Sequence, residues 1–191
     1  MQETFPSDEQ IKNAITKQKE QNPKFWYDYS FFTKADKKII SQNCNKNNQK
    51  IYILRIPVGN NISYWAMNEQ GEPIGWTKFE TSILSIKNNS AEISYHIFPN
   101  FANQGFGTLL TEESIKDFME TQPLNNKLSY TGPQRSIDSI EANINLDNLG
   151  SQALINKNGF VLESTTDGAT KNYILTREMY FSRLNNNEQK M

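Results

Sequence analysis

The chain has 191 residues, with a hydrophobic fraction of 36%, an aromatic fraction of 12% and a formal net charge of −1. This length fits one domain with a short appendage, and the apolar content is sufficient for a sizeable core. The near-neutral charge argues against nucleic acid as a partner, because phosphate backbones favour a basic surface. It permits a small anionic ligand that is held mainly by backbone groups.

Cysteine and histidine are too rare for several classes of site. Cys44 is the only cysteine and His96 the only histidine. A disulfide framework, a multi-cysteine metal site and a histidine-rich metal site are therefore excluded, and we predict no metal. The N-terminus lacks the apolar region of a secretory signal, and no apolar run approaches the ~20 residues of a membrane span. We expect a cytoplasmic protein without a membrane partner; the oligomeric state stays unknown.

The first 50 residues predict a helix followed by irregular chain. The stretch PSDEQIKNAITKQKEQ reads as a helix, in which Ser7 and Gln10 form a capping box. The aromatic run KFWYDYSFF (24–32) is typical of core packing. The polar, Asn-rich run SQNCNKNNQK (41–50) predicts an exposed loop.

A series of short strands follows, separated by turn residues such as EQGEP. We place the strands at 51–58, 62–68, 74–80 and 91–98. Helical character returns after Asn103 and ends at Pro123, which cannot continue a helix.

The remainder of the chain alternates strands and a helix. A loop at 124–135, with a short strand at 127–130, leads to a strand at 136–145. A short helix follows, with Asp147 or Asn148 near its N-cap and Gly159 as its C′ residue. The stretches FVLEST and KNYILTREMYF are the last strands, before a frayed polar tail. The predicted fold class is α+β, a single domain with one mixed, mostly antiparallel sheet flanked by helices.

Two glycines stand where the strand at 91–98 passes through a loop into the next helix. Gly105 and Gly107 in NQGFG permit either a tight turn or the close approach of a phosphate to the backbone. The first N–H groups of a helix have no intrahelical partner, and its N-terminus carries roughly +0.5 charge. The P-loop Lys-Ser/Thr pair and the Rossmann pattern are both missing. A phosphate site here would therefore bind without the signature of nucleotide hydrolysis.

Two segments together resemble a known family. AEISYHIFPNFANQGFG (91–107) is similar to the acetyl-CoA-binding motif of the GCN5-related N-acetyltransferases (GNAT superfamily). IEANINLDNLGSQALINKNGF (140–160) resembles the second motif of the branch related to ribosomal-protein N-terminal acetyltransferases. The resemblance covers about 74–176, and it implies an acetyl-CoA-dependent N-acetyltransferase that uses acetyl-CoA as co-substrate.

The resemblance also implies which residues hold the cofactor. Backbone groups of Tyr95, His96 and Ile97 would line the pantetheine arm and thioester, and Asn148 would hydrogen-bond that arm. The strands at 91–98 and 137–145 would diverge to admit it. The pyrophosphate would lie in a cradle of backbone amides from Asn103, Gln104, Gly105, Phe106, Gly107 and Thr108.

The sequence departs from the family at three positions. Ala102 stands where the first motif usually has Arg or Gln. Ile155 stands where other members have a tyrosine acid, and Asn143 where some have a glutamate base. The acid–base pair of those members therefore cannot be transferred to this chain.

Acetyl transfer to an amine needs a base, oxyanion donors and a group that stabilises the departing thiolate. Glu92 is the candidate base, on the strand where several family members place a glutamate, and its alternative is an exposed surface residue. Glu141 is the second candidate. His96 has a suitable imidazole, but a structural role is favoured for it over that of a base. Ser151 is the candidate acid or thiolate-stabilising group, and its alternative is a hydroxyl that satisfies the first turn of a helix.

Three readings of the function remain open at this point. The first is an N-acetyltransferase whose acceptor is a protein N-terminus, a lysine or a small amine. The second is a non-catalytic acyl-CoA-binding regulatory module, and the third is an interaction domain without a cofactor. We assign 1–50 to an N-terminal helical segment on the acceptor side, 51–180 to the acetyltransferase domain and 181–191 to a polar tail. Residues Phe25, Trp26, Tyr27 and Tyr29 would pack beside the acceptor.

Overall fold

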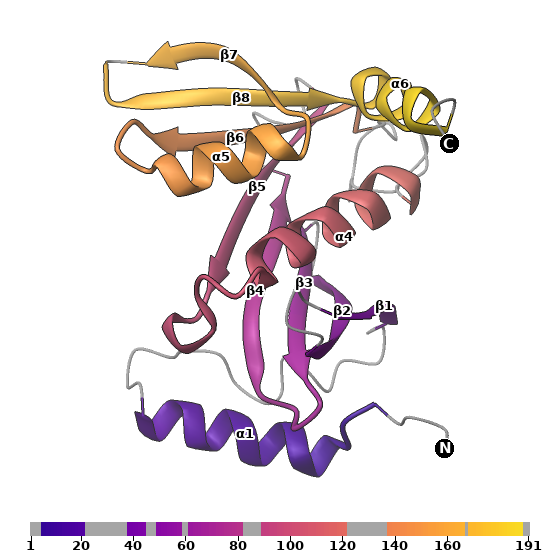
Figure 1. Cartoon of the computed structure of the whole chain (residues 1–191), viewed down its shortest axis with the longest axis vertical. Coiled ribbons are helices and arrows are strands. Elements are labelled where there is room, and N and C mark those ends of the chain that lie inside the picture. The colour runs from indigo at the N-terminus through magenta and orange to yellow at the C-terminus, as the bar shows by residue number, and fades with distance from the viewer. Residues whose placement is uncertain are drawn as a thin grey trace, which may run out of the picture. The chain divides into compact units, whose positions relative to one another are not determined.

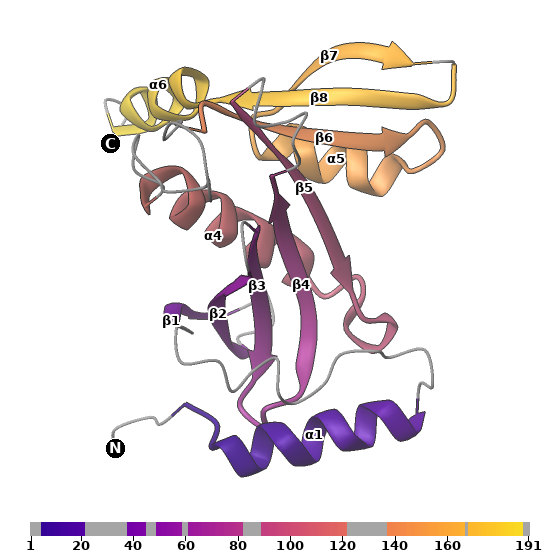
Figure 2. The same cartoon turned by 180° about the vertical axis from the view of Figure 1, so that it is seen from behind.

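The computed structural model describes residues 5–21, 38–44, 49–58, 61–81, 89–121, 137–166 and 168–188. The aromatic cluster at 25–29 and the predicted strand at 127–130 lie outside these residues. The described chain forms four α-helices and a sheet of eight strands in the order β1-β2-β3-β4-β5-β6-β8-β7 (Figure 1; Figure 2). Strands β5 and β6 pair in parallel and β6 and β8 antiparallel, so the predicted α+β class with one mixed sheet is confirmed.

Most predicted elements are present within two or three residues of their expected ends. The helices are α1 (Asp8–Gln21), α4 (Phe106–Thr121), α5 (Leu149–Lys157) and α6 (Arg177–Glu188), with a 3-10 turn η1 (Pro99–Phe101). The strands are β1 (Lys38–Cys44), β2 (Lys50–Val58), β3 (Asn61–Asn68), β4 (Pro73–Glu80), β5 (Ser90–Ile97), β6 (Ser139–Asn145), β7 (Val161–Thr166) and β8 (Thr170–Thr176).

The structure contains the helix caps that the sequence predicts. The Ser7 backbone N–H donates to Gln10 Oε1 at 2.7 Å, and the Gln10 N–H donates to Ser7 Oγ at 3.2 Å, which is the predicted capping box. Asn148 rather than Asp147 is the N-cap of α5. Gly159 follows the C-cap of α5 with φ of +90°, as expected for a C′ glycine.

The loop predicted at 41–50 is wrong for residues 41–44. These residues belong to β1, which pairs with β2 from Lys38↔Arg55 to Cys44↔Lys50. The strand lies at the edge of the sheet, where backbone pairing to one neighbour does not require alternating apolar side chains. The polar composition of residues 41–44 therefore gave no sequence signal for this strand.

The last strand is also shorter than predicted, because β8 ends at Thr176 and the chain turns into α6. Thr176 Oγ1 accepts a hydrogen bond from the Met179 N–H at 3.2 Å and so caps this helix. The helix includes residues 181–188 of the stretch expected to be a tail. Arg177 secures its start, donating from Nε to the Ile137 carbonyl at 2.8 Å and from Nη1 to the Met119 carbonyl. Burial lowers the pKa of Arg177, and nearby Asp138 opposes that shift.

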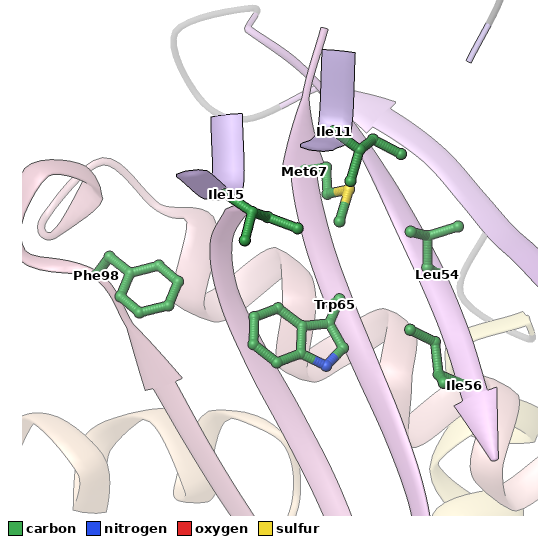
Figure 3. Close-up of a cluster of buried hydrophobic side chains, with 7 residues drawn as sticks. All are labelled: Ile11, Ile15, Leu54, Ile56, Trp65, Met67 and Phe98. Atoms are coloured by element: carbon green, nitrogen blue, oxygen red, sulfur yellow. The ribbon is translucent and has the colours of Figure 1, made fainter. Parts of the chain in front are cut away.

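The chain divides into two compact units: Met1–Thr77 with Tyr95–Ser114, and Lys78–Ser94 with Ile115–Met191. In the first unit, α1 packs on β2 and β3 through one cluster of buried side chains (Figure 3). The cluster contains Ile11, Ile15, Leu54, Ile56, Trp65, Met67 and Phe98. Gly71, with φ of +78°, lets the β3–β4 turn approach the α1 backbone, because a Cβ there would lie 3.0 Å from the Ile11 nitrogen.

In the second unit, a buried amide fixes α5 to the sheet. Gln152 Nε2 donates to the Asn145 and Leu146 carbonyls at 3.2 and 2.9 Å. Gln152 Oε1 accepts from Lys171 Nζ at 2.9 Å and from the Tyr173 hydroxyl at 3.3 Å. Tyr173 is the cross-strand partner of Ala142, so α5 covers the face of β6 that carries Ala142. Residues next to Ala142 along β6 therefore point to the opposite face.

Candidate functional site

The loop between β5 and α4 holds two residues in the left-handed region. Asn103 has φ of +60° and Gly105 has φ of +85°. Asparagine tolerates this conformation better than most residues, and glycine adopts it without steric cost. The loop begins with η1, where the Ala102 N–H donates to the Pro99 carbonyl at 3.2 Å and Gln104 Nε2 to the Asn100 carbonyl at 2.9 Å. Backbone N–H groups beside left-handed residues can form an anion-binding nest.

The helix that follows is packed directly against β5. Phe106 is 2% exposed and its ring meets Phe101 edge-on at 6.0 Å. A Cβ added to Gly107 would lie 3.3 Å from Ile97 Cγ1, so the first turn of α4 rests on the Ile97 side chain. The predicted cradle (103–108) and the end of β5 are therefore brought together, with the helix N-terminus directed at the loop.

Gly75 on β4 is a residue of this region that the sequence analysis missed. A Cβ at Gly75 would lie 2.4 Å from the His96 carbonyl oxygen and 3.1 Å from Ile97 Cα. Only glycine allows β4 to approach the backbone of His96 and Ile97 this closely. An isolated glycine within a strand pattern is a sign of such an approach, so the signal was present in IGWTKFE.

The side chains of the predicted thioester strand differ in exposure. Tyr95 and Ile97 are half-buried, while His96 is exposed. The His96 ring lies 6.1 Å from Trp76 and 5.2 Å from Phe98, in tilted and edge-on contact. The predicted contribution of these three residues through their backbone stays a prediction.

The candidate base Glu92 lies on a polar face in the second unit. Strands β5 and β6 pair through Ser90↔Ser139, Ala91↔Ile140 and Glu92↔Glu141. Glu92 and Glu141 therefore lie side by side, on the face opposite Ala142 and α5. Asn143 Nδ2 donates to Glu92 Oε1 at 3.3 Å. The paired residues are the first three of each strand, and the predicted divergence beyond them stays a prediction.

The other two predicted residues of this unit meet at the start of α5. The Ser151 backbone N–H donates to Asn148 Oδ1 at 3.0 Å, so the asparagine oxygen caps the helix. Asn148 is exposed and Ser151 half-buried. Ile155 is fully buried, so the position that carries a tyrosine acid in other members belongs to the core here.

Two classes of feature are missing from the described residues. They contain no group of three or more His, Cys, Asp or Glu side chains arranged to hold a metal ion. Among the helices within these ranges, none has the length and apolarity needed to cross a membrane.

A strand–loop–helix junction of this form is found in a known domain. The family model for the acetyltransferase (GNAT) domain matches residues 6–161. The chain belongs to the GNAT acetyltransferase family. Members of this family transfer an acetyl group from acetyl-CoA to an amine. The match begins at residue 6, so α1 and β1 are within the family domain.

Several solved structures are similar to this chain. A mutant of SpeG, the spermidine N-acetyltransferase of Vibrio cholerae, is 17% identical with a TM-score of 0.51, over 65% of this chain and 69% of that chain. The Acinetobacter baylyi protein ACIAD1637 is 21% identical with a TM-score of 0.49, over 61% and 64%. RimL, a ribosomal L7/L12 alpha-N-protein acetyltransferase in complex with coenzyme A, is 18% identical with a TM-score of 0.45, over 61% and 62%. The chain thus spans slightly less than two thirds of the last two proteins. No curated protein sequence matches the chain.

The residues of the first unit fit the pyrophosphate of acetyl-CoA. Gly105 carries no side chain that would cover the backbone amides, and Asn103 and Gly105 are already in the left-handed conformation. Ala102 is exposed and adds no charged anchor, so a pyrophosphate here would depend on the amides and the helix N-terminus.

Proposed function

We propose that the protein transfers the acetyl group of acetyl-CoA to a primary amine by direct attack on the thioester. The observation that carries this proposal is the backbone conformation at 103–107, where two left-handed residues precede the N-terminus of α4. Residues Asn103 to Thr108 would hold the pyrophosphate through their N–H groups, and the end of β5 would hold the pantetheine arm. Asn148 would add a hydrogen bond to that arm.

In the proposed step, the neutral amine nitrogen attacks the thioester carbonyl carbon, and the C–S bond breaks. An alkylammonium near pKa ~10 has no free lone pair, so a base must take its proton. Glu92 is the proposed base, because its carboxylate is exposed and accepts a hydrogen bond through only one of its two oxygens in the described structure. A backbone N–H near Ile97 would stabilise the oxyanion. Ser151 would stabilise the departing thiolate.

The acceptor is a protein N-terminus, a lysine side chain or a small amine. The names of two structurally similar proteins supply test compounds of different kinds, spermidine for SpeG and a ribosomal-protein N-terminus for RimL. A panel should therefore contain spermidine, an N-terminal peptide, an internal lysine peptide and simple alkylamines.

The proposal is tested by measuring thermal stability with acetyl-CoA and then thiol release across the amine panel. At 100 times its dissociation constant, acetyl-CoA should stabilise the protein by about 2.7 kcal/mol. At least one amine should give stoichiometric release of thiol and acetylated product. Binding without turnover on every amine would overturn the catalytic proposal and favour a non-catalytic acyl-CoA-binding module.

A matched pair of glycine variants tests the cradle itself. Gly105→Glu places a carboxylate where the pyrophosphate would lie, so acetyl-CoA stabilisation should be lost. Gly168→Glu is the control, because Gly168 is also left-handed, with φ of +64°, and lies on the β7–β8 turn with nothing within 4 Å of an added Cβ. Both variants acquire similar backbone strain. Equal acetyl-CoA binding by the two would contradict the cradle.

A further inference from the structure

We propose that Asn143 is the positioning residue that orients the carboxylate of Glu92 for proton transfer. This inference rests on the proposed function, in which Glu92 is the base. The evidence for it is the side-chain hydrogen bond from Asn143 Nδ2 to Glu92 Oε1, at 3.3 Å, between residues 51 positions apart.

The register of the sheet explains why Glu92 needs an orienting partner. Its direct cross-strand neighbour is Glu141, which projects from the same face. Two carboxylates at such a position repel each other, since like charges directly opposite are destabilising. Asn143 is the diagonal neighbour, two residues further along β6, and it offers a neutral donor. Its amide therefore draws Oε1 along the sheet toward Asn143 rather than toward Glu141.

The neighbouring amide on β8 does not share this task. Asn172 is the cross-strand partner of Asn143, but its Nδ2 donates to Glu163 Oε2 at 2.9 Å. Each asparagine thus serves a different carboxylate. Asn143 therefore donates to Glu92 Oε1, and the second oxygen of Glu92, Oε2, stays available to accept a proton from an amine.

The other charged groups on this face are limited in the described residues. On β4, Phe79 stacks on Phe118 of α4, so Lys78 and Glu80 point away from α4 and pair with each other. Ile97 contacts the first turn of α4, so alternation along β5 turns Glu92 away from α4 as well, onto the same face as Lys78 and Glu80. Glu141 is the charged residue beside Glu92 on β6. Lys78 is already paired with Glu80, so removing the Asn143 donor would leave Glu92 beside Glu141 without its hydrogen bond.

The test compares Asn143→Ala, Asn143→Asp and Asn145→Ala in the full-length protein. Asn145→Ala is the matched control, because Asn145 is exposed and lies on the same strand and face, two residues further on. Asn143→Ala should lower kcat/KM for the amine by about three- to tenfold, the loss expected for one hydrogen bond, with the KM for acetyl-CoA unchanged. The acid limb of the pH profile should move to higher pH, and further for Asn143→Asp, which adds a like charge.

The double variant Glu92→Gln/Asn143→Ala separates positioning from a structural role. If Asn143 acts through Glu92, Asn143→Ala should cause no further loss of kcat in the Glu92→Gln background. Equal profiles for Asn143→Ala and Asn145→Ala, or an acid limb that does not move in Asn143→Asp, would overturn the inference while Glu92→Gln still shows the base. If wild-type protein acetylates no amine, or Glu92→Gln keeps full activity, the proposed function itself fails and the inference fails with it.

Discussion

The cradle at 103–108 and the carboxylate face around Glu92 are built from different parts of the chain. In the proposed cradle, backbone groups would do the binding, and a side chain at Gly105 would obstruct it. On the carboxylate face, the side chain of Glu92 would act as the base, and it lies beside Glu141 and accepts a hydrogen bond from Asn143. We therefore expect the cradle to lose acetyl-CoA binding when side-chain atoms are added, and the carboxylate face to lose activity when a functional group is removed.

The largest effect is expected from removing the base. Glu92→Gln should lower kcat by about 10²- to 10⁴-fold, because general base catalysis contributes this much. Acetyl-CoA binding should be unchanged, since no cradle residue is altered. Steady-state kinetics and calorimetry on the same preparation measure both quantities. Parallel losses of turnover and acetyl-CoA affinity would show that Glu92 is not confined to the chemical step.

The next effect concerns the amide that fixes α5 to the sheet. Gln152→Leu leaves the Asn145 and Leu146 carbonyls without this donor and removes the acceptor of Lys171 and Tyr173. We expect a loss of about 2–4 kcal/mol in the free energy of unfolding, because buried polar groups lose their partners. Denaturant titration measures it.

Tyr173→Phe is the graded control for Gln152→Leu, because it removes only the 3.3 Å bond to Gln152 Oε1. Its cost should be about 0.5–1.5 kcal/mol. If the two variants cost the same, the rest of the Gln152 network adds nothing to stability.

A smaller effect is expected from adding one methyl group behind the cradle. Gly75→Ala places a Cβ 2.4 Å from the His96 carbonyl oxygen, so the backbone of β4 or β5 must shift. We expect a loss of about 1–3 kcal/mol of stability, as for overpacked cores, together with weaker acetyl-CoA binding. Calorimetry with acetyl-CoA and thermal unfolding measure the two effects.

Gly150→Ala provides the control for the Gly75 variant. Gly150 lies in α5, and the nearest atom to an added Cβ, Asn148 Oδ1, is 4.0 Å away. Alanine should there stabilise the helix by up to about 0.5–1 kcal/mol. A Gly75→Ala protein as stable as Gly150→Ala would mean that the β4–β5 approach relaxes without cost.

These two regions also differ in how far the sequence predicts them. The strand–loop–helix junction at 98–108 was predicted because its glycines, the preceding strand and the following helix are local features of one continuous segment. Gly75 belongs to the same region, but it contacts residues 96 and 97 of the neighbouring strand, which are distant in the sequence. The presence of a glycine within a strand was the only sequence signal of this close approach. The caps of α1 and α5 were likewise local and were found.

The Glu92–Asn143 contact depends on long-range register and could not be predicted. Alternation places Glu92 and Asn143 each on one face of its own strand, but it does not say which residues of two strands lie opposite. That pairing is set where β5 and β6 meet after the chain has passed through α4. The polar edge strand β1 was missed for a related reason, because its evidence is the partner strand rather than its own composition. The sequence signal for the start of α6 was local, because Thr176 caps the helix and Glu178 lies in its first turn. The apolar residues around it nevertheless suggested a strand.

The smallest predicted effect separates two roles of one side chain. Asn148 caps α5 through its oxygen, which accepts from the Ser151 N–H, and in the proposed function its amide also donates to the pantetheine arm. Asn148→Ala should cost about 1 kcal/mol of stability through loss of the cap. Asn148→Ser should restore most of that stability, because serine is also a good N-cap, but it lacks the amide donor. If the amide binds acetyl-CoA, both variants should weaken binding equally while differing in unfolding free energy. Binding that recovers together with stability in the serine variant would assign Asn148 to the helix alone.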